Sequence, residues 1–283
     1  MRPTLRPTLR LTGLAPVRMA VWAVVAADVA LLAWVLITSL KSTREVFDHP
    51  WRLPMPPTPD NYLTALEVGN FGRAAVNSAV VGLLSSLLAV AVAAPAAYAL
   101  TRTTNRAGRP LTLLFALGTG VPTQVILLPI FLMLSSLELT STLTGLTLAY
   151  VGTAMPFTVF LLTGFFRSLP GELEEAAALD GAGVWRTFLR IVVPVARPGL
   201  VTVFVLQLIV SWNETMLALV LMQDDEKETL PVALIGFAQQ QQYTGTNWGG
   251  MFAGVCVVVL PMVVLFAWVG RRVTEGMTLG MGK

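Results

Sequence analysis

The interval at residues 168–198 carries the residue types whose spacing points most directly to a function. Pro170 is followed first by acidic and then by small side chains, namely Glu172, Glu174, Glu175, Ala176, Ala177 and Ala178. A proline suits the first turn of a helix and carboxylates stabilise its positive end, so we expect a short helix to start here. The alanines keep helix propensity high and add little bulk, which lets the backbone of another protein approach closely. This is the chemistry of docking between proteins rather than of bond cleavage.

A reversal of the chain is expected directly after this helix. Gly181 can adopt the positive φ that a tight turn requires, and Asp180 just before it is suited to cap the helix that follows. Apolar residues then recur up to Ile191 and Pro194, which predicts a second amphipathic helix and so a helix-turn-helix on the cytoplasmic surface. An amphipathic linker resting on lipid headgroups has the same periodicity, so periodicity does not separate the two hypotheses.

The sequence lacks the motifs of common enzyme and metal sites. Its lysines are Lys41, Lys227 and Lys283, and none of them belongs to a Gly-x-x-x-x-Gly-Lys-Ser/Thr phosphate loop. His49 is the single histidine, which excludes a His-Glu-x-x-His site, and no Gly-x-Ser-x-Gly nucleophile elbow occurs. We therefore expect no catalytic residue, no metal and no cofactor bound by this chain, and an energy source on another polypeptide.

These motifs sit among long apolar runs. Of the 283 residues 55% are hydrophobic and only 12% are charged, about half the charged share of an ordinary soluble domain. Six runs are long enough to cross a bilayer, at residues 19–40, 74–100, 111–134, 143–166, 200–222 and 250–270. The sequence predicts an all-α polytopic membrane protein with six transmembrane helices, organised as one transmembrane domain over residues 1–283.

The basic residues predict how the runs are oriented. If the N-terminus is inside the cell, 14 of the 19 Lys and Arg residues fall on cytoplasmic segments, as the positive-inside rule requires. Both termini are then cytoplasmic in the cell (inner) membrane. The charged residues, which sum to a net charge of +3, are confined to short intervals between the apolar runs. They form no basic patch, so the sequence does not indicate a nucleic-acid partner.

Two of the runs contain a carboxylate. The polar side chains of the fifth run are Gln207, Ser211, Trp212, Asn213 and Glu214. An unpaired charge at mid-membrane costs about 2.5–3.5 kcal/mol, so Glu214 must face protein or water, and this helix is our candidate for lining a substrate path. Packing or gating between subunits explains the cluster equally well. Asp28 in the first run is more simply explained by pairing with Arg18 or a partner subunit than by transport.

The interval at residues 168–198, called the docking interval below, resembles a known sequence signature. Permease subunits of binding-protein-dependent ABC importers carry an EAA loop, in which Glu-Ala-Ala, three residues, Gly and nine residues precede Ile-x-Leu-Pro. This chain has Glu175-Ala176-Ala177, Gly181 and Ile191-Val192-Val193-Pro194 at that spacing, with Val193 in place of Leu. Shorter segments resemble the MalG-like carbohydrate branch of the family, at residues 77–78, 211–214, 229–232 and 275–280.

The resemblance implies a type I ABC importer permease whose EAA loop is a coupling helix. The implied partners are a second, MalF-like permease, two ATPase subunits that hold ATP and Mg, an extracytoplasmic solute-binding protein and membrane lipid. A sugar or oligosaccharide is the implied cargo. Another solute such as a glycerol phosphodiester is the alternative, although no apolar run contains an interior Lys or Arg to favour an anion. An ion-coupled secondary transporter would leave the EAA-like loop without a purpose.

Overall fold

The computed structural model of the protein describes residues 15–102 and 108–280, and every regular element within these ranges is a helix. In chain order the helices are α1 (Ala15–Ser39), α2 (Thr43–Asp48), α3 (Asp60–Val68), α4 (Phe71–Arg102), α5 (Gly108–Gly118), α6 (Thr123–Ser136), α7 (Leu143–Arg167), α8 (Glu172–Leu179), α9 (Val184–Thr187), the π-helical segment η2 (Phe188–Val192), α10 (Val193–Asn213), α11 (Met216–Leu221), α12 (Leu230–Thr244) and α13 (Trp248–Gly280). The predicted all-α class is confirmed. Residues 1–14 and 281–283, which contribute to the predicted orientation, lie outside the described ranges, as do the side chains of the tail segment 275–280.

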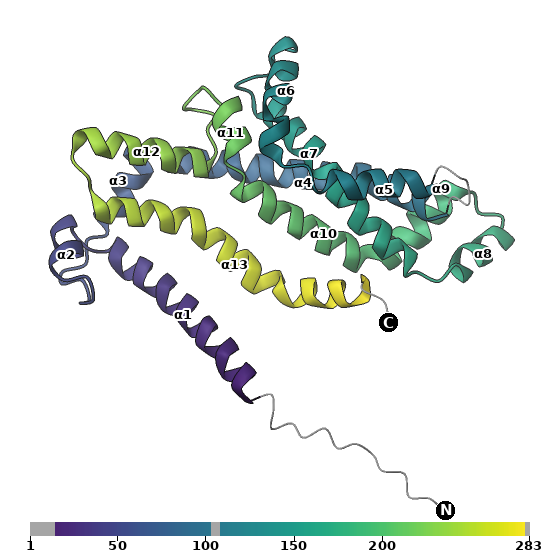
Figure 1. The fold of residues 1–283 in the computed structure, drawn as a ribbon, viewed down its shortest axis with the longest axis horizontal. Coiled ribbons are helices and arrows are strands. Elements are labelled where there is room, and N and C mark those ends of the chain that lie inside the picture. Colours follow the sequence, from purple (N-terminus) through teal and green to yellow (C-terminus); the bar gives the residue numbers. More distant parts are fainter. Residues whose placement is uncertain (1–14, 103–107, 281–283) are drawn as a thin grey trace, which may run out of the picture.

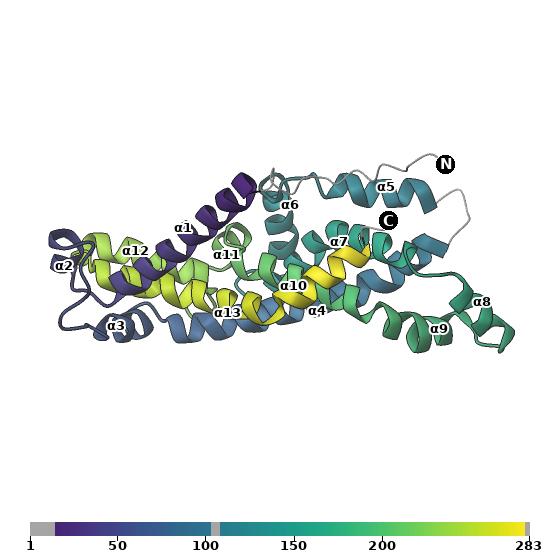
Figure 2. The same ribbon diagram turned by 90° about the horizontal axis from the view of Figure 1, so that it is seen from below.

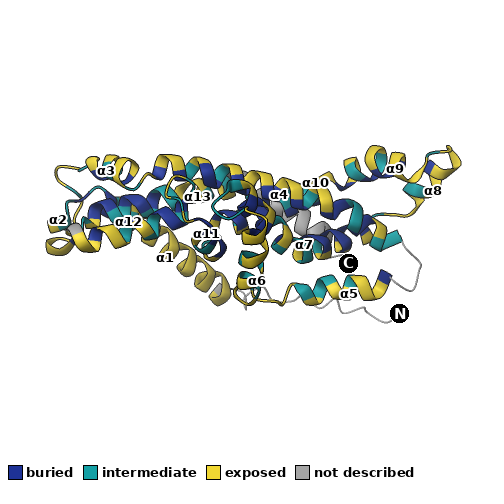
Figure 3. Cartoon of the chain, turned by 90° about the horizontal axis from the view of Figure 1, so that it is seen from above, coloured by how far each residue is buried: buried dark blue, intermediate teal, exposed yellow. Residues whose placement is uncertain are grey.

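The long helices run roughly along one axis and form an elongated bundle (Figure 1). Buried residues concentrate where α4, α7, α10 and α13 meet, whereas α1, α6 and α8 are mostly exposed (Figure 3). One core cluster joins α4, α7 and the η2–α10 segment through Ala97, Leu162 and Val203. A second joins α3, α4, α12 and α13 around Phe71 and Phe237. Small residues on α4 let these helices approach closely, as is usual in membrane bundles.

Five of the helical stretches are each long and apolar enough to cross a membrane, and α5 with α6 supplies a sixth candidate as a bent pair. This pair is bent by 98°, so the apolar run at residues 111–134 is present as two helices rather than one. The cause is local: Gly118, Gly120 and Pro122 interrupt the helical ladder. Gly118 also lies against α7, where a Cβ would come within 3.0 Å of Pro156.

The predicted fifth span also differs at both ends. A single helical stretch runs from Val184 to Asn213, so the second helix of the docking interval does not stop at Pro194 but continues into the span. The π-helical turn allows this, because the N–H of Val193 bonds to the carbonyl of Phe188 and the ladder is adjusted just before the proline, which has no N–H. At the other end the helix stops at Asn213, and α11 is a separate short helix.

Helix α1 leans on the bundle near its C-terminal end only. Trp34 packs edge-on against Phe252 of α13 at a ring distance of 5.5 Å, and the preceding turns are exposed on all sides. Asp28 and Arg18 are both exposed, and within the described residues no ion pair joins them. The apolar surface of α1 is therefore left for lipid or for another subunit.

Candidate functional site

The docking interval forms one extremity of the molecule, where α8 and the turn after it project beyond the other helices (Figures 1 and 2). Helix α8 begins at Glu172, with three glutamates in its first turn, as the sequence predicts. It ends in a Schellman turn, in which the N–H of Ala182 bonds to the carbonyl of Ala177 at 2.9 Å and the N–H of Gly181 bonds to that of Ala178 at 3.0 Å. Gly181 has a φ of +73°, so the predicted positive φ is present.

One detail of this turn was predicted wrongly. Asp180 is the C-terminal cap of α8 rather than the N-cap of the next helix, and Gly183 occupies that N-cap position without a side-chain bond. The physical reason is the length of the connection. The Schellman turn uses Gly181 and Ala182 to close α8, so the following helix starts too far along the chain for the Asp180 carboxylate to reach its free N–H groups.

The turn exposes an acidic and apolar surface that this chain does not cover. Glu175, Ala176, Asp180 and Gly181 are exposed, whereas Ala177 is buried against the chain itself. Ile191 is half-buried and Pro194 is exposed, both on the stretch that leads into the span. Large apolar side chains are exposed beside them, and these are Leu179, Val184, Trp185 and Leu189. Such a patch is typical of a protein or membrane interface.

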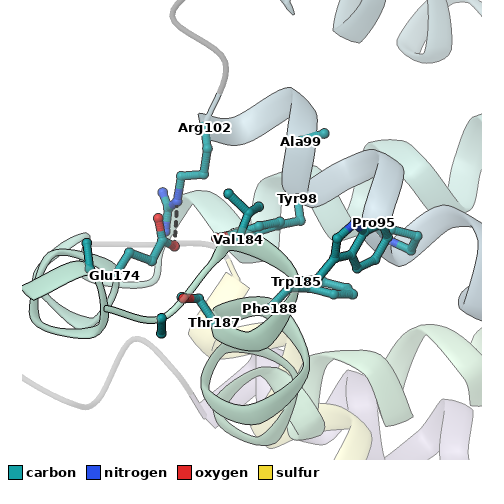
Figure 4. A pocket seen from close by; sticks show the side chains of 11 residues that line it. Pro95, Tyr98, Ala99, Arg102, Glu174, Val184, Trp185, Thr187 and Phe188 are labelled. Carbon is teal, nitrogen blue, oxygen red and sulfur yellow. Dashed lines mark hydrogen bonds and ion pairs between the residues drawn. The ribbon is translucent and has the colours of Figure 1, made fainter. Parts of the chain in front are cut away.

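Behind the turn lies a cavity of about 510 Å³ between α8, α9 and the end of α4. Figure 4 shows Arg102 reaching from α4 to Glu174 on α8, with Tyr98, Trp185 and Phe188 beside them. The Nε of Arg102 lies 2.7 Å from Oε1 of Glu174, and the two side chains are only 27% and 21% exposed. The Tyr98 and Phe188 rings pack 5.0 Å apart. The ion pair is partly shielded from water and joins α8 to α4.

The five polar residues of the fifth span do not form a single group. Gln207, Ser211 and Trp212 are buried, and Ser211 accepts a hydrogen bond from Ser85 of α4 at 3.2 Å. The indole N–H of Trp212 donates to the carbonyl of Val258 in α13. These contacts bind α10 to neighbouring helices of the same chain. Lining of a substrate path and packing between subunits both stay predictions. Asn213 is the exposed member of the set.

Glu214 marks the break between α10 and α11. Its Oε1 accepts the N–H of Leu217 at 3.0 Å, and its Oε2 accepts the N–H of Ala218 at 3.2 Å and the hydroxyl of Tyr150 at 2.9 Å. The carboxylate thus replaces helical partners at the start of α11 and ties that helix to α7. The expectation that Glu214 faces protein or water is met by these contacts.

Sequence reasoning missed the contacts of Arg102 and Glu174. The sequence predicts only that Arg102 is one of the 14 basic residues on the cytoplasmic side and that Glu174 is an acidic residue in the first turn of a helix. They lie 72 positions apart, and nothing in the local pattern of either predicts that they meet. The i, i+3 spacing of Glu174 from Ala177 places both on one face of α8, but this spacing does not indicate which residue Glu174 meets.

Comparison with known proteins gives consistent matches. The family model described as "Binding-protein-dependent transport system inner membrane component" matches residues 79–275. The chain is 32% identical over 271 residues to the diacetylchitobiose uptake system permease protein NgcG of Streptomyces coelicolor, covering 96% of this chain and 89% of that protein. It is 35% identical over 250 residues to the trehalose transport system permease protein SugB of Mycobacterium tuberculosis, covering 88% and 90%. A chain in the crystal structure of a bacterial ABC transporter involved in alginate import has the same fold, with a TM-score of 0.75, 23% identity and coverage of 95% and 99%.

Proposed function

Because this chain belongs to the family of binding-protein-dependent transport system inner membrane components, we propose that it carries a sugar or oligosaccharide into the cytoplasm, coupled through residues 168–198 to separate ATPase subunits. The observation that carries the proposal is the α8 turn. It projects from a bundle of membrane-crossing length, it is closed by Gly181 at positive φ, and it exposes Glu175 and Ala176 to a partner. The chain is a membrane component, and the hydrolysis of ATP belongs to another subunit.

A sugar is the cargo that the relatives favour. The systems named for the two relatives above take up diacetylchitobiose and trehalose, which are both disaccharides. The apolar runs of this chain contain no Lys or Arg, so the chain offers no interior cation to an anionic solute. A neutral saccharide is bound by hydrogen bonds and aromatic faces instead. Asn213, exposed at the end of α10, is the side chain we assign to that path, with Glu214 fixing the adjacent break.

The proposed assembly places the α8 turn in the cytoplasm, with both termini on the same side. The turn then docks on an ATPase subunit through Glu175, Ala176, Asp180 and Gly181. Exposed apolar faces on α1, α5 and α6 are suited to lipid and to a second permease, because helix surfaces in a bilayer need no polar cover. A solute-binding protein meets the opposite side, where α2, α3 and the end of α12 lie (Figure 1).

Reconstitution tests this function directly. The chain is incorporated into vesicles with its partner permease and ATPase, and labelled sugar is supplied with the binding protein. Uptake that requires ATP and all components is expected, and the purified chain alone should bind no ATP. Screening the binding protein against neutral disaccharides, acidic sugars and glycerol phosphodiesters identifies the cargo class. Accumulation by the chain alone, driven by a proton gradient, would refute the proposal.

A further inference from the structure

Helix α4 is attached at one end to the loop between α11 and α12. The amide of Asn77 donates hydrogen bonds to the carbonyls of Glu226 and Glu228, both at 3.0 Å. In the next position the hydroxyl of Ser78 accepts the N–H of Leu230 at 2.8 Å. Asn77 and Ser78 are 8% and 4% exposed, so these bonds are shielded from water. They join residues about 150 positions apart and fix the start of α12 to one turn of α4.

The other end of α4 is attached to the α8 turn. Arg102, the last residue of the helix, pairs with Glu174 at 2.7 Å and reaches the carbonyl of Leu169 at 3.4 Å. Among residues 15–102 and 108–280 little else holds α8, because Ala177 is the one buried residue of this helix. The orientation of α8 therefore depends on α4 more than on a packed core of its own.

The two attachment points are separated along α4 by a distance that is large enough to cross a membrane. Asn77 and Arg102 are 25 positions apart in one helix, which corresponds to about 38 Å along its axis at 1.5 Å per residue. This exceeds the roughly 30 Å hydrocarbon core of a bilayer. Pro95 removes one backbone bond between them, but α4 stays a single helix from Phe71 to Arg102. Its small residues Ala93, Ala94 and Ala97, near the Arg102 end, share a core cluster with α7.

From this geometry we propose that α4 transmits the state of the α11–α12 loop to the α8 turn, with Asn77 and Arg102 as the positioning residues at its two ends. The proposal rests on the proposed function, since the loop then faces the binding protein and α8 faces the ATPase. Neither residue touches sugar or nucleotide. Through these two residues, a displacement of the α11–α12 loop moves α4, and α4 in turn moves α8. Coupling between distant sites requires such a mechanical connection.

The test uses the complete transporter in vesicles and measures ATPase activity with and without the sugar-loaded binding protein. Asn77→Ala should leave assembly and the unstimulated rate intact. In the complex that assembles, Asn77→Ala and Arg102→Gln should each lower the stimulated-to-unstimulated ratio at least about fivefold, the lower end of usual coupling factors. Ser86→Ala is the matched control for the first variant, because Ser86 is equally buried in α4 but bonds only to Gly82 of its own helix. It should keep the wild-type ratio.

The double variant separates transmission from two local effects. If one element carries the signal, Asn77→Ala with Arg102→Gln should show the ratio of the more severe single variant, whereas independent defects would multiply. Exchanging the charges, as Arg102→Glu with Glu174→Arg, should restore at least half of the lost stimulation and keeps the test valid if Arg102→Gln does not assemble. Three outcomes would each overturn the inference. They are a double variant whose loss of stimulation is the product of the two single losses, a single variant with the wild-type ratio of stimulated to unstimulated ATPase activity, and an assembled charge-exchange variant that recovers no stimulation. Failure of the proposed function is distinct, since the wild-type complex itself would then not import sugar.

Discussion

Replacing Gly181 with valine should uncouple the transporter without unfolding it. Gly181 has a φ of +73°, a region that residues with a Cβ enter only at a cost. An added Cβ would meet no atom within 4 Å, so the penalty comes from the backbone alone and not from a clash. In that region the cost is about 1–2 kcal/mol for an ordinary residue and more for a β-branched one.

That penalty acts on a segment with few other restraints. The Schellman bonds of Gly181 and Ala182 close α8, and the helix has a single buried residue to keep it in place. A loss of 1–2 kcal/mol lowers the population of the native turn by about 5- to 30-fold relative to alternatives. The share of molecules in which the Glu175 and Ala176 surface is misplaced rises by the same factor. Membrane insertion should be unaffected, because the spans are untouched.

Two further variants make this measurement specific. Gly183→Val adds the same side chain two residues away, at a φ of −72° and with no atom within 4 Å, and should be nearly neutral. Gly181→Asn should recover much of the activity, because asparagine tolerates positive φ. The assays are copurification of the ATPase and sugar uptake by reconstituted vesicles. Full uptake by Gly181→Val, or equal damage from Gly183→Val, would refute the argument from backbone strain.

Three other substitutions test the packing of the spans, with thermal unfolding in detergent as the measurement. Gly199→Ala should destabilise the chain by about 1–3 kcal/mol, because its Cβ would lie 2.5 Å from the Phe165 ring, and Gly164→Ala in open space is its control. Thr229→Val should leave stability unchanged or raise it, since the buried Thr229 hydroxyl has no hydrogen-bond partner; a clear loss would contradict this reasoning. Glu214→Ala should cost more than Tyr150→Phe, because it leaves two backbone N–H groups without their partner and reduces the phenol to its 3.3 Å bond to the carbonyl of residue 214. The reverse order would show that Glu214 does not hold the α10–α11 break.

The features that the sequence predicts well are those set by nearby residues. The start of α8, its acidic first turn and the reversal at Gly181 follow from side chains within about ten positions, and all are present. The number and approximate place of the apolar stretches are likewise readable, because each exceeds the bilayer thickness on its own. The local order of residues is enough to predict these features.

The features it predicts poorly depend on how helices bend and meet. The summed hydropathy of residues 111–134 does not reveal the 98° bend, because the apolar side chains before and after Gly118 have similar hydropathy values. The break at Glu214 is similar, since a carboxylate that accepts two backbone N–H groups ends a helix without any proline or glycine. The Arg102–Glu174 pair requires a tertiary contact that neither sequence neighbourhood contains.

The hydrogen bonds of the membrane helices bear on where sugar selectivity resides. The buried polar side chains of α4 and α10 are engaged within the chain: Asn77 and Ser78 hold the α11–α12 loop, and Ser211 with Trp212 joins neighbouring helices. A site that binds one saccharide selectively needs hydrogen-bond donors and acceptors that can pair with the sugar. A side chain that is already hydrogen-bonded within the chain must first lose that bond. Of the five polar residues we assigned to the path, Asn213 alone is exposed. Its amide N–H donates to the carbonyl of Ile209 at 2.8 Å. We therefore expect the choice of cargo to be made mainly by the binding protein and the second permease. Exchanging the binding protein for that of a relative should therefore change the sugar taken up, whereas Asn213→Ala should lower the rate for every sugar alike.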